Sequence, residues 1–317
     1  MRLVFAGTPV TAVPTLEALL KSRHAVAAVI TRPDAKSGRG QQMAASPVAA
    51  RAREAGVEVL RPDRPADPAF LARLRQIGPD CCPVTAYGAL IPREALDIPV
   101  HGWVNLHFSV LPAWRGAAPV QHAILHGDDV TGATTFRLVP ELDAGPVFGV
   151  LTEVIRPSDT AGDLLDRLAV AGADLMVATL DGIESGELEA RDQPAGGVSR
   201  APKITPADAN INWHQPAVAI GRLIRACTPE PGAWTELDGV RVKVWPVALR
   251  SAEPQLRDGA AIPLAPGELG TLRNRVLVGT ATSPVELGDV QQHGKRRMPA
   301  ADWARGVRQG SRPAVLG

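Results

Sequence analysis

The segment from Asn105 to Gly145 holds three side chains that together suit acyl-transfer chemistry: Asn105, His107 and Asp143. Asn105 and His107 alternate along a predicted strand, so their side chains point to one face. An amide and an imidazole can donate hydrogen bonds to the oxyanion of a tetrahedral species. A carboxylate or an imidazole can take a proton from an attacking amine and return one to a leaving nitrogen. The set therefore fits transfer of an acyl-type carbon between two nitrogens, with no Ser or Cys nucleophile.

Each of these residues alone has a commoner structural explanation. A single His near a strand end is usually structural, and an Asp in a Leu-Asp-Ala-Gly turn usually forms the turn. A lone Asn is usually a cap or loop residue, and Arg115 by itself is most often a solvated cation. The prediction of chemistry therefore depends on their combination.

An alternation of strand and helix patterns in the first half of the chain must position these side chains. Short apolar runs predict strands over residues 3–6, 25–31, 57–60, 80–86 and 103–107. Helical spacing of apolar residues predicts helices over residues 11–21, 46–55 and 68–76. Such alternation indicates an α/β domain with a Rossmann-like, mostly parallel sheet covered on both faces. Ligands collect at the carboxyl ends of such strands, which is where residues 103–107 end in the polar cluster.

Several patterns are missing. Gly7-Thr8-Pro9 follows the first strand, but it matches neither G-x-G-x-x-G nor G-x-x-x-x-G-K-[ST], so we infer neither NAD nor ATP. Cys81, Cys82 and Cys227 form no disulfide or zinc pattern and are interpreted as buried small hydrophobic residues in a reducing compartment. We expect no metal.

Two stretches interrupt the alternation. Residues 33–45 form a polar, Gly-containing loop, and residues 187–208 are rich in Pro, Gly and charge. A helix over residues 216–226 and short apolar runs at 240–245 and 275–278 then predict a small β-barrel. The predicted domains are a catalytic domain over 1–189, a linker over 190–207 and an OB-like domain over 208–317.

The net charge of +1 does not suggest a nucleic-acid binder that works by bulk charge. The residues after position 206 carry a slight excess of Lys and Arg, which is compatible with weak phosphate contact. The sequence shows no signal-peptide or membrane-spanning apolar run. We therefore expect a cytoplasmic protein without membrane contact, and a monomer.

The run N-L-H-F-S-V-L-P-A-W-R-G-A-A-P, from Asn105, resembles the signature N-x-H-x-S-L-L-P-x-x-R-G-x-x-P of the folate-dependent formyltransferases. The resemblance implies 10-formyltetrahydrofolate as co-substrate and Asn105, His107 and Asp143 as the catalytic residues. It also implies a folate pocket lined by Ser109, Val110, Leu111 and Pro112. The run departs from the signature at Val110, an apolar replacement of Leu for which we expect little effect.

Further segments are similar to the members of this family that formylate methionyl initiator tRNA. They are FAGTP at 5–9, TRPDAKSGRGQQ at 31–42, AYGALIP at 86–92, APKIT at 201–205, RACTPEPGAW at 225–234 and GKRRM at 294–298. The resemblance spans both domains and the linker, and it implies an OB-like second domain and a loop in which Arg39 contacts the acceptor stem. Lys295 and Arg296, in a short basic run, are further candidate tRNA contacts.

The resemblance implies direct transfer from the folate to the methionyl amine. Asn105 and His107 would stabilise the oxyanion, and Asp143 would orient His107 or a water and manage protons. A sugar-nucleotide N-formyltransferase is the nearest alternative, and a non-catalytic RNA-binding protein with an OB-like barrel is an alternative of another class. The loop around Arg39 and the GKRRM run favour tRNA over a sugar, and the three polar residues favour an enzyme over a binding protein.

Overall fold

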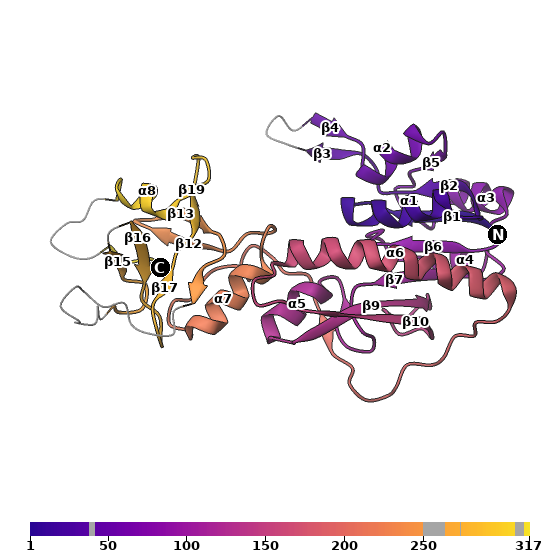
Figure 1. Cartoon of the computed structure of the whole chain (residues 1–317). Coiled ribbons are helices and arrows are strands. Elements are labelled where there is room, and N and C mark those ends of the chain that lie inside the picture. The colour runs from indigo at the N-terminus through magenta and orange to yellow at the C-terminus, as the bar shows by residue number, and fades with distance from the viewer. Residues whose placement is uncertain (38–41, 250–263, 273, 308–313) are drawn as a thin grey trace. The chain divides into compact units, whose positions relative to one another are not determined.

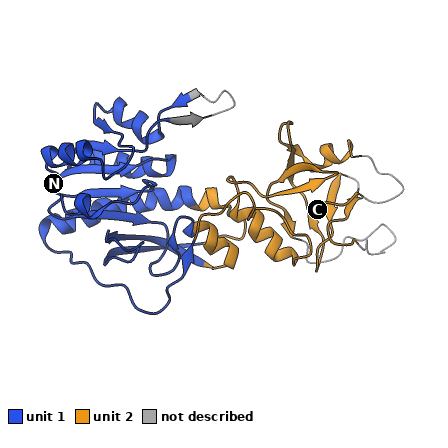
Figure 2. Cartoon of the chain, turned by 180° about the vertical axis from the view of Figure 1, so that it is seen from behind, with its two compact units in different colours: residues 1–119, 130–154, 165–201 blue, residues 120–129, 155–164, 202–317 orange. Residues whose placement is uncertain are grey.

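A computed structural model of the chain describes residues 1–37, 42–249, 264–272, 274–307 and 314–317 (Figure 1). They form two compact units, coloured separately in Figure 2. The first unit comprises residues 1–119, 130–154 and 165–201, and the second comprises 120–129, 155–164 and 202–317. Residues 190–201 of the predicted linker thus pack with the first unit. The domain boundaries at 189 and 208 stay a prediction.

The first unit is built on a seven-stranded sheet in the order β10-β9-β7-β6-β1-β2-β5. Its strands are β1 Arg2–Gly7, β2 Ala25–Ile30, β5 Glu58–Leu60, β6 Cys82–Thr85, β7 Trp103–His107, β9 Val130–Arg137 and β10 Val147–Val154. The first five pair in parallel, while β9 and β10 add two antiparallel strands at one side. The predicted mostly parallel α/β sheet is confirmed.

Helices cover both faces of this sheet. They are α1 Val13–Lys21 with the short η1 Val10–Ala12 before it, α2 Pro47–Glu54, α3 Pro68–Ile77, α4 Arg93–Leu96 and α6 Ala161–Ser185. α3 and α4 pack on one face, in a buried cluster with alternate residues of β1, β2 and β6 and with Trp103. On the opposite face, Thr85 of β6 bonds Thr15 of α1 at 3.2 Å, and Gly172 of α6 packs against Leu106 of β7.

Local sequence explains where these helices begin and end. Ser46 caps α2, because its Oγ accepts a hydrogen bond from the backbone N–H of Ala49 at 3.0 Å. Pro47 follows at the first helical position, where its missing N–H costs nothing. Gly78 ends α3 in the left-handed conformation, with φ of 60°. Ser46 and Pro47 agree with the predicted start of α2, and Gly78 ends α3 one residue beyond its predicted end at residue 76.

The predicted loop at residues 33–45 contains a short hairpin. β3 Ala35–Ser37 pairs in antiparallel fashion with β4 Gln42–Ala44. Two three-residue strands with polar residues show too little alternation for prediction, so the sequence indicated only a loop. Residue 39, the predicted tRNA contact Arg39, lies outside the described residues.

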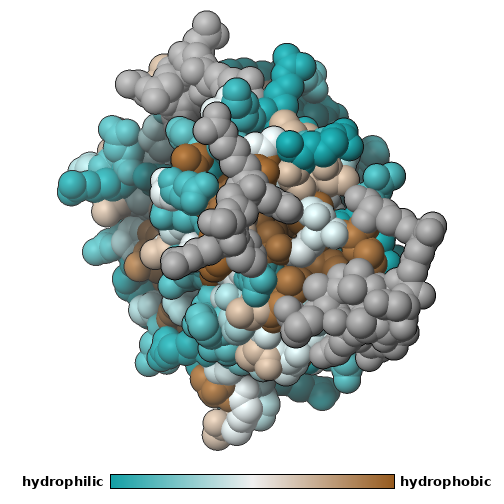
Figure 3. Space-filling model, turned by 90° about the vertical axis from the view of Figure 1, so that its left-hand side faces the viewer, coloured by the Kyte–Doolittle hydropathy of each residue, from teal (hydrophilic) through white to brown (hydrophobic). Residues whose placement is uncertain are grey.

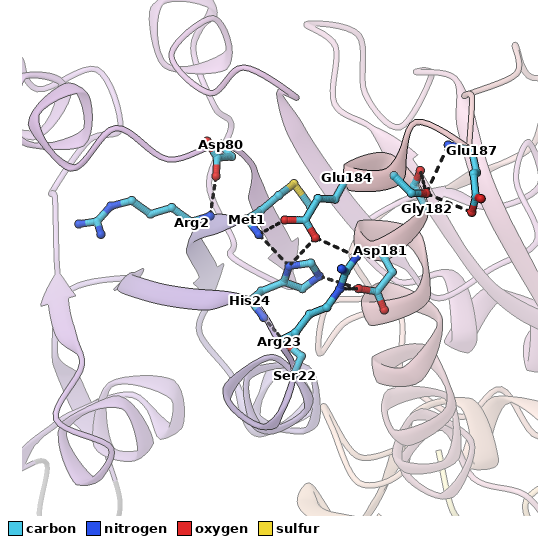
Figure 4. A network of polar contacts seen from close by, with 11 residues as sticks. Met1, Arg2, Ser22, Arg23, His24, Asp80, Asp181, Gly182, Glu184 and Glu187 are labelled. Carbon is cyan, nitrogen blue, oxygen red and sulfur yellow. Dashed lines mark hydrogen bonds and ion pairs between the residues drawn. The ribbon is translucent and has the colours of Figure 1, made fainter.

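Ion pairs tie Met1 and Arg23, which precede strands β1 and β2, to α6 (Figure 4). The Met1 amino group pairs with Glu184, and Arg23 pairs with Asp181 at 2.6 Å and with Glu184 at 2.8 Å. His24 is buried between them, with Nε2 at 3.2 Å from an oxygen of Asp181. The cluster fixes α6 on the sheet.

The second unit contains two four-stranded antiparallel sheets, β12-β13-β18-β19 and β14-β17-β16-β15. Its strands are β12 Trp234–Leu237, β13 Val240–Val244, β14 Ala248–Leu249, β15 Leu269–Leu272, β16 Arg275–Val278, β17 Val285–Glu286, β18 Asp289–Gln292 and β19 Met298–Pro299. Its helices are α7 Ala217–Ala226, α8 Ala300–Ala304 and residues 120–126 of α5 Pro119–His126. Both sheets contribute to one buried core, so the predicted small β domain is confirmed.

The surface is mixed in character. On the face that Figure 3 shows, brown apolar residues gather near the centre among teal hydrophilic ones. Among the residues that the structure describes, no helix is both long and apolar enough to cross a membrane.

Candidate active site

Strand β7 delivers two of the three predicted catalytic side chains. Trp103, Asn105 and His107 alternate along it and share one face. Trp103 is buried in the core beneath α4 and its Nε1 donates to Ala95 O at 2.8 Å. Asn105 and His107 follow Trp103 on this face, toward the carboxyl end of the strand. At these two positions the face is polar and no longer apolar.

A cavity of about 560 Å³ opens at this end of the sheet. Its lining comes from β6 and the segment after it, from β7, from residues 116–119 and from the β9–β10 connection; it includes Tyr87, Leu90, Asn105, His107, Leu138 and Asp143. The structure therefore brings Asn105, His107 and Asp143 together in one cavity. The Asn105 amide bonds no described group of the chain, so it can donate into the cavity.

His107 is held in one orientation. Its side chain is buried, with Nε2 at 2.9 Å from Trp114 O. Because a carbonyl oxygen can only accept, Nε2 must carry a hydrogen, and Nδ1 is the atom left for proton transfer. Burial lowers the pKa of His107 from its ordinary value of 6.5, while the Asp143 charge and the bond to Trp114 oppose that effect. The imidazole is thus neutral near pH 7, with the Nδ1 lone pair available.

Asp143 faces that atom. Its Oδ2 lies 3.7 Å from His107 Nδ1 and accepts a hydrogen bond from Gly116 N–H at 2.8 Å. The residue is 9% exposed and has a φ of 50°, which non-glycine residues seldom adopt. Its carboxylate can therefore stabilise a proton taken up by His107 Nδ1.

The predicted folate residues lie in the turn after β7 and not in this cavity. Ser109 is fully buried and donates through Oγ to Ala113 O at 2.6 Å. Thr134 Oγ1 donates to Ser109 O and accepts from Leu111 N–H, so it braces the turn. Leu111 lines a second cavity of about 690 Å³, between β10 and residues 186–194, while Ser109, Val110 and Pro112 line neither cavity. A folate role for these four residues stays a prediction.

The larger part of the cavity wall was not predicted as a site. The segment from Ala86 to Ile91 and the residues Leu138 to Leu142 supply most of the apolar lining. A signal existed for the first segment only, since AYGALIP was among the stretches similar to a known family.

The candidate tRNA residues Lys295 and Arg296 lie in the turn between β18 and β19 of the second unit. Both are exposed, and neither forms an ion pair with any described residue. Their neighbour Arg297 is occupied, because it pairs with Asp289 at 2.7 Å and lies over the Trp245 ring. Both cations are thus available to bind phosphate, and a tRNA role for them stays a prediction.

One group of described residues has metal-ligand geometry, but it lies outside the cavity. The ligand atoms of His24, Asp181 and Glu184 are within 4.8 Å of one another. Arg23 and the Met1 amino group already pair with both carboxylates. The protein's own cations balance the cluster, so we assign it a structural role.

Comparison with other proteins first defines the class. Residues 1–180 match the formyl transferase family, and residues 203–308 match the formyl transferase C-terminal domain. The fold resembles the N-formyltransferase of Helicobacter canadensis, solved in complex with folinic acid and dTDP-3-aminofucose. The TM-score is 0.66 at 19% identity, over 92% of this chain and 99% of that one, which shows the fold alone. Fold and family together define a two-domain formyl transferase.

Closer relatives identify the branch. The methionyl-tRNA formyltransferase of Thermobifida fusca (strain YX) is 65% identical over 98% of this chain and 97% of its own length. That of Nocardioides sp. (strain ATCC BAA-499 / JS614) is 63% identical, over 97% of this chain and 96% of its own. The chain belongs to the methionyl-tRNA formyltransferase family.

Proposed function

We propose that the protein transfers the formyl group of 10-formyltetrahydrofolate to the α-amino group of methionyl initiator tRNA, for translation initiation. The observation that carries the proposal is the meeting of Asn105, His107 and Asp143 in one cavity. The identity of up to 65% over nearly the whole chain with proteins that bear this name supports the same acceptor.

The cavity suits the flat ring system of the folate. Its volume of about 560 Å³ falls in the range of small-molecule pockets, and apolar residues such as Leu90 and Leu138 dominate its wall. The folate supplies a formyl carbon on N10, which the methionyl nitrogen attacks.

The side chains then take the roles that their geometry allows. Asn105 donates from its amide to the developing oxyanion, a contact worth about 3 kcal/mol in comparable sites. The sequence led us to expect His107 as a second oxyanion donor, but its Nε2–H already bonds Trp114 O, so we assign it the role of base instead. His107 Nδ1 takes the proton that the attacking amine loses, and later returns one to the leaving nitrogen. Asp143 stabilises the protonated imidazole, with its Oδ2 at 3.7 Å from Nδ1. Holding both reactants in place contributes roughly 7 kcal/mol or more.

A competition assay tests the function. The protein is given 10-formyltetrahydrofolate with methionyl initiator tRNA and an aminated sugar nucleotide, and both acceptors are analysed for formylation. We expect formyl-methionyl-tRNA, lost in His107→Ala and kept in the matched control His101→Ala, since His101 does not line the cavity. Formylation of the sugar alone would transfer the proposal to the sugar-nucleotide enzymes, and formylation of neither would refute it.

A further inference from the structure

The segment predicted as a linker, residues 190–207, contacts the backbone that forms hydrogen bonds with His107 and Asp143. Ser199 accepts hydrogen bonds from Trp114 N–H through Oγ at 2.8 Å and from Arg115 N–H through its backbone oxygen at 2.9 Å. The strands β8 Arg115–Gly116 and β11 Arg200–Ala201 then pair in parallel. The backbone of residues 114–116 forms hydrogen bonds with both catalytic side chains: Trp114 O with His107 Nε2, and Gly116 N–H with Asp143 Oδ2.

Gln193 makes the most direct of these contacts. Its Nε2 donates to Asp143 O and to Gly145 O, both at 2.8 Å. Its Oε1 accepts from Arg115 Nε at 3.1 Å and Nη2 at 2.6 Å. Because a guanidinium can only donate, Arg115 fixes the amide with its oxygen toward Arg115 and both amide hydrogens toward the two carbonyls.

The backbone at both ends of this network needs such support. Asp143 and Trp114 have φ values of 50° and 59°, where a non-glycine residue is held only if its surroundings over-determine it. Gly145 lies so close to Arg137 that a Cβ would be 1.8 Å from the Arg137 oxygen. The loop of Asp143 is thus tightly packed, and Gln193 bonds the carbonyl of its strained residue.

We propose that Gln193, oriented by Arg115, is a positioning residue that holds the Asp143 carboxylate against His107 Nδ1 and Gly116 N–H. The proposal rests on the proposed function for its catalytic meaning. Gln193 touches no reacting atom in this assignment. It acts by fixing the backbone of Asp143, while Ser199 fixes the backbone that bonds His107.

The decisive variants are Gln193→Ala and Gln193→Glu. The glutamate keeps the length of the side chain and its contact with Arg115, but it removes both donors and faces two carbonyl oxygens with negative charge. The matched control is Gln76→Ala on α3, because Gln76 also pairs with an arginine, at 2.7 Å from Arg73 Nη1, and does not line the cavity.

Steady-state kinetics with 10-formyltetrahydrofolate and methionyl initiator tRNA should separate positioning from folding. We expect kcat to fall about 10- to 100-fold in both variants, as for a small misplacement of a catalytic group, with the KM for folate nearly unchanged. The limb of the pH profile that reports His107 should move to lower pH, because Asp143 raises the pKa of His107. The other ionisable side chains lining the cavity are Tyr87 and Glu141.

A crystal structure of Gln193→Glu supplies a readout besides activity. We expect the contact between Asp143 Oδ2 and Gly116 N, 2.8 Å in the wild type, to be lost or lengthened. An intact contact, or a wild-type kcat, would overturn the positioning role, as would a loss of kcat with an unmoved pH limb. If the wild type formylates no tRNA, the proposed function fails, and the fate of this contact still decides the positioning role.

Discussion

Replacing Asp143 by Asn isolates the effect of its charge on catalysis. The amide keeps the shape of the carboxylate and an oxygen for Gly116 N–H, but it removes the negative charge 3.7 Å from His107 Nδ1. At an effective dielectric constant of about 20, a pair of unit charges at this distance interacts by about 4 kcal/mol. If His107 takes the amine's proton, most of that energy enters the transition state, and the rate should fall about 10³-fold.

Single-turnover transfer from 10-formyltetrahydrofolate to methionyl initiator tRNA measures this step without interference from product release. The matched control is Asp80→Asn, because the Asp80 carboxylate also accepts a backbone hydrogen bond, from Arg2 N at 2.6 Å, and does not line the cavity. We expect the control to retain the wild-type rate. An Asp143→Asn rate within tenfold of wild type would show that no imidazolium forms at His107 during transfer.

Three further perturbations follow from the structure. Asn105→Ala should lower kcat about 100-fold with folate affinity kept, because one oxyanion donor is lost; turnover and equilibrium binding measure the two effects. In Gly116→Ala the new Cβ would lie 2.5 Å from Ala201 O at a φ of 131°, so the melting temperature and kcat should both fall, with a loss of about 1–3 kcal/mol in unfolding free energy. Burial lowers the pKa of His107 and of His24. The folded state therefore binds fewer protons, and the stability that these residues contribute is full above pH 6.5 and lost as pH falls through their folded pKa values. Denaturant titrations across this range should show a shallower pH dependence for His24→Asn, and an unchanged slope would contradict the assignment.

The strand that carries Asn105 and His107 could be predicted, because a short apolar run and an alternation of side chains mark β7 in the sequence. Its bounds, Trp103–His107, agree with the prediction, and the alternation placed Asn105 and His107 on one face as the structure has them. The start of the helix after Ser46 could also be predicted from the sequence, because a capping serine and a proline mark it locally. These features are local in sequence.

The support of the site could not be predicted in the same way. Gln193 and Ser199 lie in a stretch rich in Pro and Gly, which indicated a linker, and their contacts with Arg115 and Asp143 span 50 residues or more. No local pattern reports such pairings. The left-handed backbone at Asp143 likewise results from its packed surroundings, since an aspartate sequence gives no reason to expect a φ of 50°.

The cavity wall shows how much of a site a motif leaves unmarked. The dense signature around Ser109 and Leu111 marked a turn that is buried and braced by Thr134. Most of the cavity wall beside the catalytic residues comes instead from residues 86–91 and 138–142. Tyr87 and Glu141 are the only residues of these two segments with ionisable side chains. Cavities lined by apolar groups leave little trace in residue types.

Transfer of isotopically labelled formyl from 10-formyltetrahydrofolate tests the proposed reaction most directly, with the label located by mass spectrometry of the aminoacyl-tRNA. We expect the labelled carbon on the α-nitrogen of methionine, one per tRNA, with an equal amount of tetrahydrofolate released. Release of labelled formate with unmodified methionyl-tRNA would contradict the proposal, because it would show that the cavity delivers the formyl group to water.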